Sequence, residues 1–409
     1  MEQAANVVVA PDDSPNARLS LKDAATQATR SWVPTSREGV RRHRFAIQVY
    51  LSTRLLLLVL AGVNIPLQHW GLKEELTNWD GYWYTATAQH GYPSAVLHTQ
   101  TNLGFFPLYP MCIWLLHRLP FLSAAAAGVV IAEAGGLVAT LLIERLANSW
   151  WGPTGARRAV IIFCVFPGSV VFSMAYSEGI LIPLVAGCLL ALQQRKWILA
   201  GALAGLATAV GPDGLPVIVV CVVAAALAYG QARDGGESAR GALFAPLLSL
   251  VGVGGFALFL WAWTGSPFAS LVAQHDGWGE RSDALALYRQ ARTVVKEISF
   301  SQFNYHAINL NYVVGLLGAI VLVVGLVMMF KRPYTVPLEA RLWTVGVGVL
   351  SVTSEYVPPN PRLLLTAFPV LLVIAHRASR RGFQWLVAVN VALLITLSAI
   401  TYAGSALRP

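Results

Sequence analysis

The fold is decided by an apolar run that reads INLNYVVGLLGAIVLVVGLVMMF from Ile308 to Phe330. The run contains no acidic or basic residue and, as a helix, is long enough to cross the roughly 30 Å hydrocarbon core of a bilayer. Similar runs recur along the chain, which is 56% hydrophobic and only 12% charged. A soluble protein carries about twice that charged fraction. The sequence therefore predicts an all-α polytopic membrane protein.

About eleven transmembrane helices are expected in all. The apolar runs lie near 45–66, 121–143, 158–174, 178–194, 197–211, 214–230, 242–264, 308–330, 340–354, 362–377 and 383–403. Residues 106–118 are also apolar, but this run is short and contains two prolines. If it crossed the membrane, every later loop would change sides, and the Lys and Arg residues would no longer gather on one face. We therefore expect it to lie in the membrane interface.

The loops between these runs define two faces. Residues 1–44 are polar and lack the apolar stretch of a signal peptide, so we expect a disordered cytoplasmic tail. The transmembrane domain then occupies 45–409. Two long loops, at about 67–120 and 265–307, face outward in this topology, as does the turn before Arg362. Any chemistry is expected on the outer face.

Composition argues against several other classes of protein. The net charge is +9, but the basic residues lie between apolar runs, where they orient helices rather than bind nucleic acid. The four cysteines are scattered through apolar segments without the spacing of a zinc site or a disulfide framework. The sequence also lacks a Walker loop, an HExxH motif and a DxD pair, which argues against a nucleotide substrate.

The first long loop places one carboxylate among aromatic rings. It reads Asn78-Trp79-Asp80-Gly81-Tyr82-Trp83-Tyr84, and a second cluster follows at Phe105-Phe106-Pro107-Leu108-Tyr109-Pro110. Aromatic residues gather at membrane–water interfaces, so one interpretation is an aromatic belt that contains an Asp. An acid at that depth is costly unless it is used. The other interpretation is a site in which the partly desolvated Asp80 acts as a general base.

The second long loop contains a basic, hydrogen-bonding set that suits a phosphate or a polar sugar, although a solvated basic loop is the alternative. Its members are Gln274, His275, Asp276, Trp278, Arg281, Arg289, Arg292, Lys296, Tyr305 and His306. Elsewhere, Glu178 either binds sugar hydroxyls or caps the next helix through its dipole. Glu133 lies within a predicted span beside two glycines, which favours a structural hydrogen bond between closely packed helices.

Five short motifs, in this order, resemble those of the PIG-V-type mannosyltransferases, relatives of GPI mannosyltransferase 2 within the GT-C class of membrane glycosyltransferases. The motifs are Trp79 to Tyr84, His90-Gly91-Tyr92, Phe105 to Pro110, Phe166 to Glu178, and Thr264 to Gly279. The resemblance extends from about residue 45 to 377. It implies a GT-C-type fold whose first outer loop carries helices that lie along the membrane.

The resemblance also implies an activity. The donor would be mannose on a polyprenyl or dolichyl phosphate, and the acceptor a glycolipid or polysaccharide, with no nucleotide, cofactor or essential metal. Asp80 would be the catalytic base of an inverting transfer. The substrate-binding residues that we expect are Trp79, Trp83, Tyr84, Tyr109, Glu178, Gln274, His275, Trp278, Arg281, His306 and Arg362.

Two positions depart from the family pattern. The family often has an Arg where Gly211 stands, and a Tyr where Leu363 follows Arg362. The first departure leaves contacts to the donor or the acceptor in doubt, whereas the second keeps the Arg. The Ala-, Arg- and Gly-rich composition, without any Asn-x-Ser/Thr sequon, favours a bacterial inner-membrane protein whose site faces the periplasm.

Two alternative functions remain open at this point. A transporter or flippase of lipid-linked sugars would have inverted repeats and several ionisable residues within its spans. Only Arg54 and Glu133 lie clearly inside predicted spans, and no repeat is evident. A noncatalytic accessory subunit is the other alternative. Asp80 in its aromatic setting argues against it, while Gly211 argues mildly for it.

Overall fold

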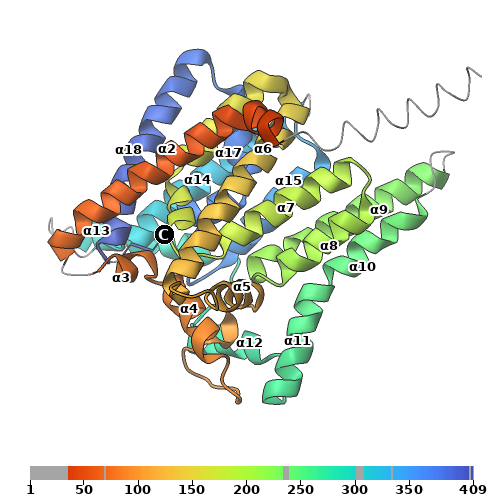
Figure 1. Cartoon of the computed structure of the whole chain (residues 1–409). Helices are drawn as coiled ribbons and strands as arrows, with labels where there is room; N and C mark the ends of the chain where they lie inside the picture. The colour runs from red at the N-terminus through yellow and green to blue at the C-terminus, as the bar shows by residue number, and fades with distance from the viewer. Residues whose placement is uncertain are drawn as a thin grey trace, which may run out of the picture. The chain divides into compact units, whose positions relative to one another are not determined.

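The structure is a computed structural model that describes residues 36–68, 71–233, 239–300, 308–332, 335–404 and 407–408. The chain divides into a short unit, Met1–Phe45, and a large unit, Ala46–Pro409, which contains the site. Across the described ranges the secondary structure is helical, with one isolated bridge between Ser282 and Ser354 and no sheet. Figure 1 shows this architecture, which confirms the predicted all-α class. Most of the predicted tail, residues 1–35, lies outside the described residues.

Long apolar helices make up much of the large unit. They are α2 (Ser36–Gln68), α6 (Ala124–Val165), α9 (Pro216–Arg233), α14 (Leu310–Phe330), α18 (Arg380–Tyr402), and the consecutive pair α10 (Phe244–Ser249) and α11 (Val251–Thr264). By length and composition, six helices in the described residues can cross a membrane, or seven if the bent pair η2 (Pro167–Ser173) and α7 (Glu178–Gln193) forms one span. The chain is therefore an integral membrane protein. The predicted number of about eleven spans is not confirmed.

Several of the predicted spans are short or broken. The short apolar helices are α8 (Trp197–Thr208), α15 (Leu338–Thr353), α16 (Pro361–Thr366) and α17 (Pro369–Arg377). At 1.5 Å per residue, none of them reaches the length of a complete span. The run at 362–377 breaks because Pro369 has no N–H with which to continue α16. In α6, a positive φ of 72° at Gly152 separates residues 124–151 from 153–165.

The two long loops contain short helices. The first holds α3 (Leu72–Leu76), α4 (Asp80–His90), η1 (Asn102–Gly104) and α5 (Leu108–Leu116), and the second holds α12 (Ala269–Val272), η5 (Ala273–Gly277) and α13 (Ala286–Phe300). The short connectors η3 (Pro212–Gly214) and η4 (Arg240–Leu243) flank α9. At about 14 Å, α5 is far too short to cross a bilayer, as expected for an interfacial segment. Helix α4 packs against α5, and α12 packs against η1, at the lower end of the view in Figure 1.

The two ionisable residues within predicted spans make structural hydrogen bonds. The guanidinium of Arg54 donates to the Ser169 hydroxyl at 3.0 Å and to the Cys164 carbonyl at 3.3 Å. The Ser173 hydroxyl donates to the Glu133 carboxylate at 2.7 Å, and the Tyr50 hydroxyl lies 3.1 Å from the other Glu133 oxygen. These contacts join α2, α6 and η2, so both residues act as ties between helices, and the structural role predicted for Glu133 is confirmed.

Glycines allow α6 and α7 to approach closely. A Cβ atom on Gly135 would lie 1.7 Å from the carbonyl oxygen of Gly179, and one on Gly179 would lie 2.4 Å from the Ala132 Cα. Small residues at such contacts let helix backbones pack directly in membranes. This contact positions the N-terminus of α7, where Glu178 begins the helix.

A branched side chain at the α6–α7 contact should destabilise the protein. We expect Gly135→Val to lower the free energy of unfolding by at least about 1–3 kcal/mol, because the backbone of α7 must move away. Gly254→Val is the matched control, since a Cβ on Gly254 meets no atom within 4 Å. Chemical denaturation in mild detergent measures both, and equal stability of the two variants would contradict the close packing.

Candidate active site

Asp80 is the first residue of α4 and lies beside a loop from a distant part of the chain. Its backbone N–H donates to the Tyr176 hydroxyl at 3.3 Å, and its carboxylate accepts a hydrogen bond from the Arg362 guanidinium. The Asp80 side chain is 30% exposed. The preceding residue, Trp79, has a φ of 58°, which is unusual for a residue other than glycine and costs on the order of 1–3 kcal/mol. The turn into α4 is thus held by its surroundings rather than by local preference.

Arg362 is positioned by the start of α16. The Asn360 side chain accepts from the Leu363 N–H at 3.0 Å and caps the helix, while Pro361 occupies its first turn. Gly168 of η2 allows the Pro361 carbonyl to approach, because a Cβ at this position would lie 2.1 Å from that oxygen. The cap and the close contact fix the backbone from which the guanidinium reaches toward α4.

The Arg362 guanidinium is enclosed by carboxylates and a phenol ring. Its Nη1 atom pairs with Asp80, its Nε lies 3.4 Å from Glu178 Oε1, and its centre lies 5.6 Å from the Tyr176 ring centroid. Only 14% of the Arg362 side chain and 3% of the Glu178 side chain are exposed. Asp213 of η3 also interacts electrostatically with Arg362. One cation therefore faces three carboxylates, so the cluster carries excess negative charge when all three are ionised.

Glu178 has no hydrogen-bond partner at its second oxygen. The Oε2 atom is buried and makes no hydrogen bond to any described residue. Removing a carboxylate oxygen from water without a partner costs free energy unless a neighbouring cation compensates. Here the neighbouring cation is Arg362. The pairing gives Glu178 a role beyond that of a simple helix cap.

The aromatic residues of the first loop form a packed wall rather than a row of separate rings. Trp83 stacks on Phe105 with ring centroids 6.1 Å apart and meets Trp278 edge-on at 5.1 Å. The Tyr84 hydroxyl donates to Ser177 Oγ at 2.8 Å, and the Tyr109 hydroxyl donates to the Gly128 carbonyl at 2.9 Å. Burial raises the pKa of both phenols, so both remain neutral hydrogen-bond donors. In this arrangement Tyr84 and Tyr109 position α4 and α5.

The second loop is tied to the first by hydrogen bonds to the backbone. The Trp278 indole N–H donates to the Thr101 carbonyl at 3.0 Å, and the Gln274 amide donates to the Gly104 carbonyl at 3.1 Å. His275 is exposed and lies 2.6 Å from Asp276, which His98 of the first loop also contacts. Hydrogen bonds from both histidines lower the pKa of Asp276. These polar side chains hold the loops together in this structure.

The structure brings some of the sequence-predicted site residues together and leaves others apart. Asp80, Glu178 and Arg362 meet directly, with Trp79 beside them. The tyrosines and tryptophans of the first loop and Gln274, His275 and Trp278 of the second make the contacts given above. Arg281 is exposed, and its carbonyl accepts from the Glu355 N–H at 3.0 Å. His306 lies outside the described residues.

Sequence reasoning did not identify Tyr176 or Asp213 as members of the site. A signal was present for Asp213, because it lies in a polar turn at the outer end of two predicted spans, where the other site residues were expected. In the same turn, a Cβ on Gly211 would meet no atom within 4 Å. The backbone there leaves open space at the position where the resembling family often has an arginine.

Comparison with known proteins supports the resemblance. No family model matches the sequence. GPI alpha-1,6-mannosyltransferase 2 of Cricetulus griseus is 28% identical over 155 residues, which make up 36% of this chain and 30% of that protein. This is the mannosyltransferase type that the sequence motifs resemble, and the chain matches less than a third of the relative's length.

Solved structures show the fold. ArnT from Cupriavidus metallidurans in the apo state superposes with a TM-score of 0.50 at 15% identity, covering 82% of this chain and 61% of that one. The apo oligosaccharyltransferase of Archaeoglobus fulgidus gives a TM-score of 0.47 at 12% identity, covering 88% and 56%. The chain thus spans about three fifths of the ArnT chain. The similarity to ArnT confirms the predicted GT-C-type fold.

Removing the positive charge of Arg362 should destabilise the folded protein. We expect Arg362→Gln to lower the free energy of unfolding by about 3 kcal/mol, because it leaves Glu178 buried without a counter-ion. In the double variant Arg362→Gln/Glu178→Gln, the loss should be smaller than the sum of the single losses by about 1–3 kcal/mol. Arg289→Gln is the control, since the Arg289 side chain is 61% exposed and its pairs with Asp283 and Glu355 should contribute less than about 1 kcal/mol. Additive losses at 362 and 178 would show that the two residues are not coupled.

Glu280 should make stability depend on pH. The Ser354 hydroxyl donates to its carboxyl at 2.9 Å, and burial raises the pKa from 4.5 to about 7. Because the folded state binds this proton more tightly than the unfolded state, the stabilisation is complete below about pH 4.5 and is lost as the pH rises through 7. Glu280→Gln should therefore melt at a higher temperature than the wild type at about pH 8 and differ little at about pH 4.5. Glu355→Gln removes a carboxylate that is paired with Arg289, so its melting temperature should not rise at about pH 8. A rise for Glu355→Gln but not for Glu280→Gln would show that Glu280 is not the group that causes the pH dependence.

Proposed function

We propose that the protein is a membrane glycosyltransferase that moves mannose from a polyprenyl-phosphate-linked donor to a glycolipid or polysaccharide acceptor on the outer face of the membrane. The observation that carries the proposal is the placement of Asp80. Its carboxylate is partly exposed at the start of α4, whereas its neighbours Glu178 and Arg362 are almost completely buried. The mannosyltransferase relative supports the choice of sugar, and the GT-C-type fold supports the class of reaction.

A lipid-carried donor suits the setting of this site. Its prenyl tail would remain in the bilayer, while the phosphosugar would lie at the interface near α4 and α5. Trp83 is partly exposed beside Phe105 and Trp278, and aromatic faces of this kind commonly lie at the boundary between apolar and polar surroundings. Membrane lipids and the lipid-linked donor are therefore the partners that we propose.

The proposed reaction is a direct displacement at the anomeric carbon. The acceptor hydroxyl oxygen attacks this carbon while its proton moves to the Asp80 carboxylate. The bond between the anomeric carbon and the phosphate oxygen breaks, and its electron pair leaves with the polyprenyl phosphate. Attack from the face opposite the leaving group inverts the anomeric configuration. Arg362 fixes the direction of the Asp80 carboxylate through the hydrogen bond from Nη1.

Loss of the base should abolish transfer without preventing donor binding. Asp80→Asn keeps an oxygen that can accept from Arg362 but cannot take up a proton at this step. We expect it to fold, to bind the lipid donor and to lose mannose transfer by at least about a hundredfold, in line with the contribution of a general base. The measurement is incubation of purified protein with polyprenyl-phosphate-mannose and a panel of lipid acceptors, followed by mass analysis.

The matched control is Glu74→Gln, which removes an exposed carboxylate from α3 of the first loop. It should retain transfer within about threefold, because surface substitutions of this kind have small effects. If folded Asp80→Asn protein transfers mannose at close to the wild-type rate, Asp80 is not the base. If the wild type transfers no sugar to any acceptor from polyprenyl-phosphate-mannose, the proposed donor is wrong.

A further inference from the structure

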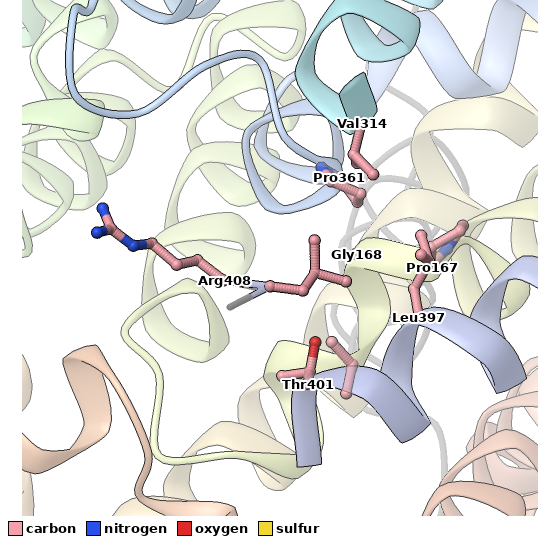
Figure 2. A pocket seen from close by; sticks show the side chains of 9 residues that line it. Pro167, Gly168, Val314, Pro361, Leu397, Thr401 and Arg408 are labelled. Atoms are coloured by element: carbon pink, nitrogen blue, oxygen red, sulfur yellow. The ribbon is translucent and has the colours of Figure 1, made fainter. Parts of the chain in front are cut away.

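The segment that follows α18 returns to the candidate active site. Leu407 is only 3% exposed and lines an apolar crevice beside α16 and η2. Figure 2 shows this crevice, which is lined by Pro167, Gly168, Val170, Val314, Pro361, Leu397, Thr401, Leu407 and Arg408. The Arg408 backbone N–H donates to the Asn311 side-chain oxygen at 2.9 Å, near the start of α14. A buried side chain and a hydrogen bond therefore fix the backbone from which Arg408 extends.

In Figure 2 the Arg408 side chain extends away from the other labelled residues. Its guanidinium lies over two aromatic rings. Its guanidinium carbon lies 4.4 Å from the Tyr356 ring centroid and 5.5 Å from that of Trp79. Trp79 directly precedes Asp80, so the cation contacts the residue that forms the turn into α4. Tyr356 also lies edge-on to Trp278, which contacts Trp83. The Arg408 guanidinium thus contacts aromatic residues that pack around the site.

The charge balance distinguishes Arg408 from Arg362. Arg362 already faces Asp80, Glu178 and Asp213, so an arriving phosphate would meet a cation whose charge is more than compensated. Among the described residues, the neighbours of the Arg408 guanidinium are aromatic faces, and the structure pairs it with no carboxylate. Its positive charge is therefore available to an anionic ligand at this site.

Within the part of the chain that the structure describes, the Arg408 side chain contacts two rings and donates no hydrogen bond. A guanidinium that stacks on rings uses its flat face, and its N–H groups lie in the plane of the group, directed outward. Two parallel N–H donors match two phosphate oxygens in a bidentate contact. Stacking on Tyr356 and Trp79 consequently orients the cation without using the groups that recognise phosphate.

We propose that Arg408 binds the phosphate of the lipid-linked donor. This inference rests on the proposed function and adds the residue that recognises the leaving group. The ligand class is a polyprenyl monophosphate or its sugar ester, held by the Arg408 N–H groups beside Trp79. The same contact stabilises the negative charge that develops on the phosphate when the sugar departs.

The test measures the affinity of labelled undecaprenyl phosphate for the purified full-length protein in detergent. Thermophoresis detects the binding. Arg408→Gln should weaken binding at least about tenfold, which corresponds to the loss of a charge-assisted hydrogen bond. Arg408→Lys keeps the charge but not the bidentate geometry, so its affinity should fall between those of the wild type and Arg408→Gln. The control is Arg380→Gln, at the other end of α18, which should bind like the wild type.

Two competitors separate the possible sources of the phosphate. Inorganic phosphate and phosphatidylglycerol, each at the concentration at which undecaprenyl phosphate saturates the site, should leave the labelled lipid bound. Displacement by either one to the same degree as by undecaprenyl phosphate would indicate a general anion site and overturn the inference. A melting temperature measured in parallel shows whether each variant is folded.

Different results would refute the role of Arg408 and the lipid-phosphate donor. Unchanged undecaprenyl phosphate affinity in folded Arg408→Gln protein would mean that Arg408 only supports Trp79, and the donor assignment of Arg408 would be wrong while the transferase proposal stood. A wild-type protein that does not bind undecaprenyl phosphate would refute the lipid-phosphate donor itself.

Discussion

The placement of one buried arginine is the constraint on which the candidate site depends. Arg362 contacts Asp80 of α4 and Glu178 of α7, and its own backbone lies in α16, so three separate helices meet at a single guanidinium. Transferring a charged group out of water costs several kcal/mol, and only well-placed opposite charges repay this cost. If α4, α7 or α16 shifted by a few ångströms, at least one charge would be left buried and unpaired. The ion pairs therefore penalise incorrect arrangements of the helices more than they add to net stability.

The rest of the fold provides the close contacts that this arrangement requires. Gly135 and Gly179 bring α6 and α7 together, and Gly168 admits the backbone of α16. Because lipid tails are as apolar as the helix surfaces, helices in a membrane gain little from hydrophobic burial and depend on such packing. Arg54 and Glu133, bonded to neighbouring helices, act in the same way. A proton relay or an ion pathway would need groups that can exchange partners, so these contacts favour a structural role over transport.

The sequence singled out residues that meet in the structure, but it did not predict how they meet. Asp80 was identified because a carboxylate among aromatic rings is unusual, and Arg362 because it ends a polar turn on the outer face. Their direct contact could not be predicted, since the two residues are 282 positions apart and apolar periodicity carries no information about which helices are neighbours. The number of spans was not confirmed for a related reason. Run length does not reveal a break such as that at Pro369, which lies inside the predicted span 362–377.

The pairing of Asp80 with Arg362 restricts what this arginine can contribute to donor binding. Its guanidinium already fixes the direction of Asp80 and lies 3.4 Å from Glu178 Oε1. Within the proposed mechanism, a phosphate that drew on the same guanidinium would compete with Asp80 and Glu178 for it. A separate cation at Arg408 would let the donor bind without first breaking the ion pair that holds α4, α7 and α16 together. The ion pair between Arg362 and Asp80 would then remain intact until Asp80 accepts the proton of the acceptor hydroxyl.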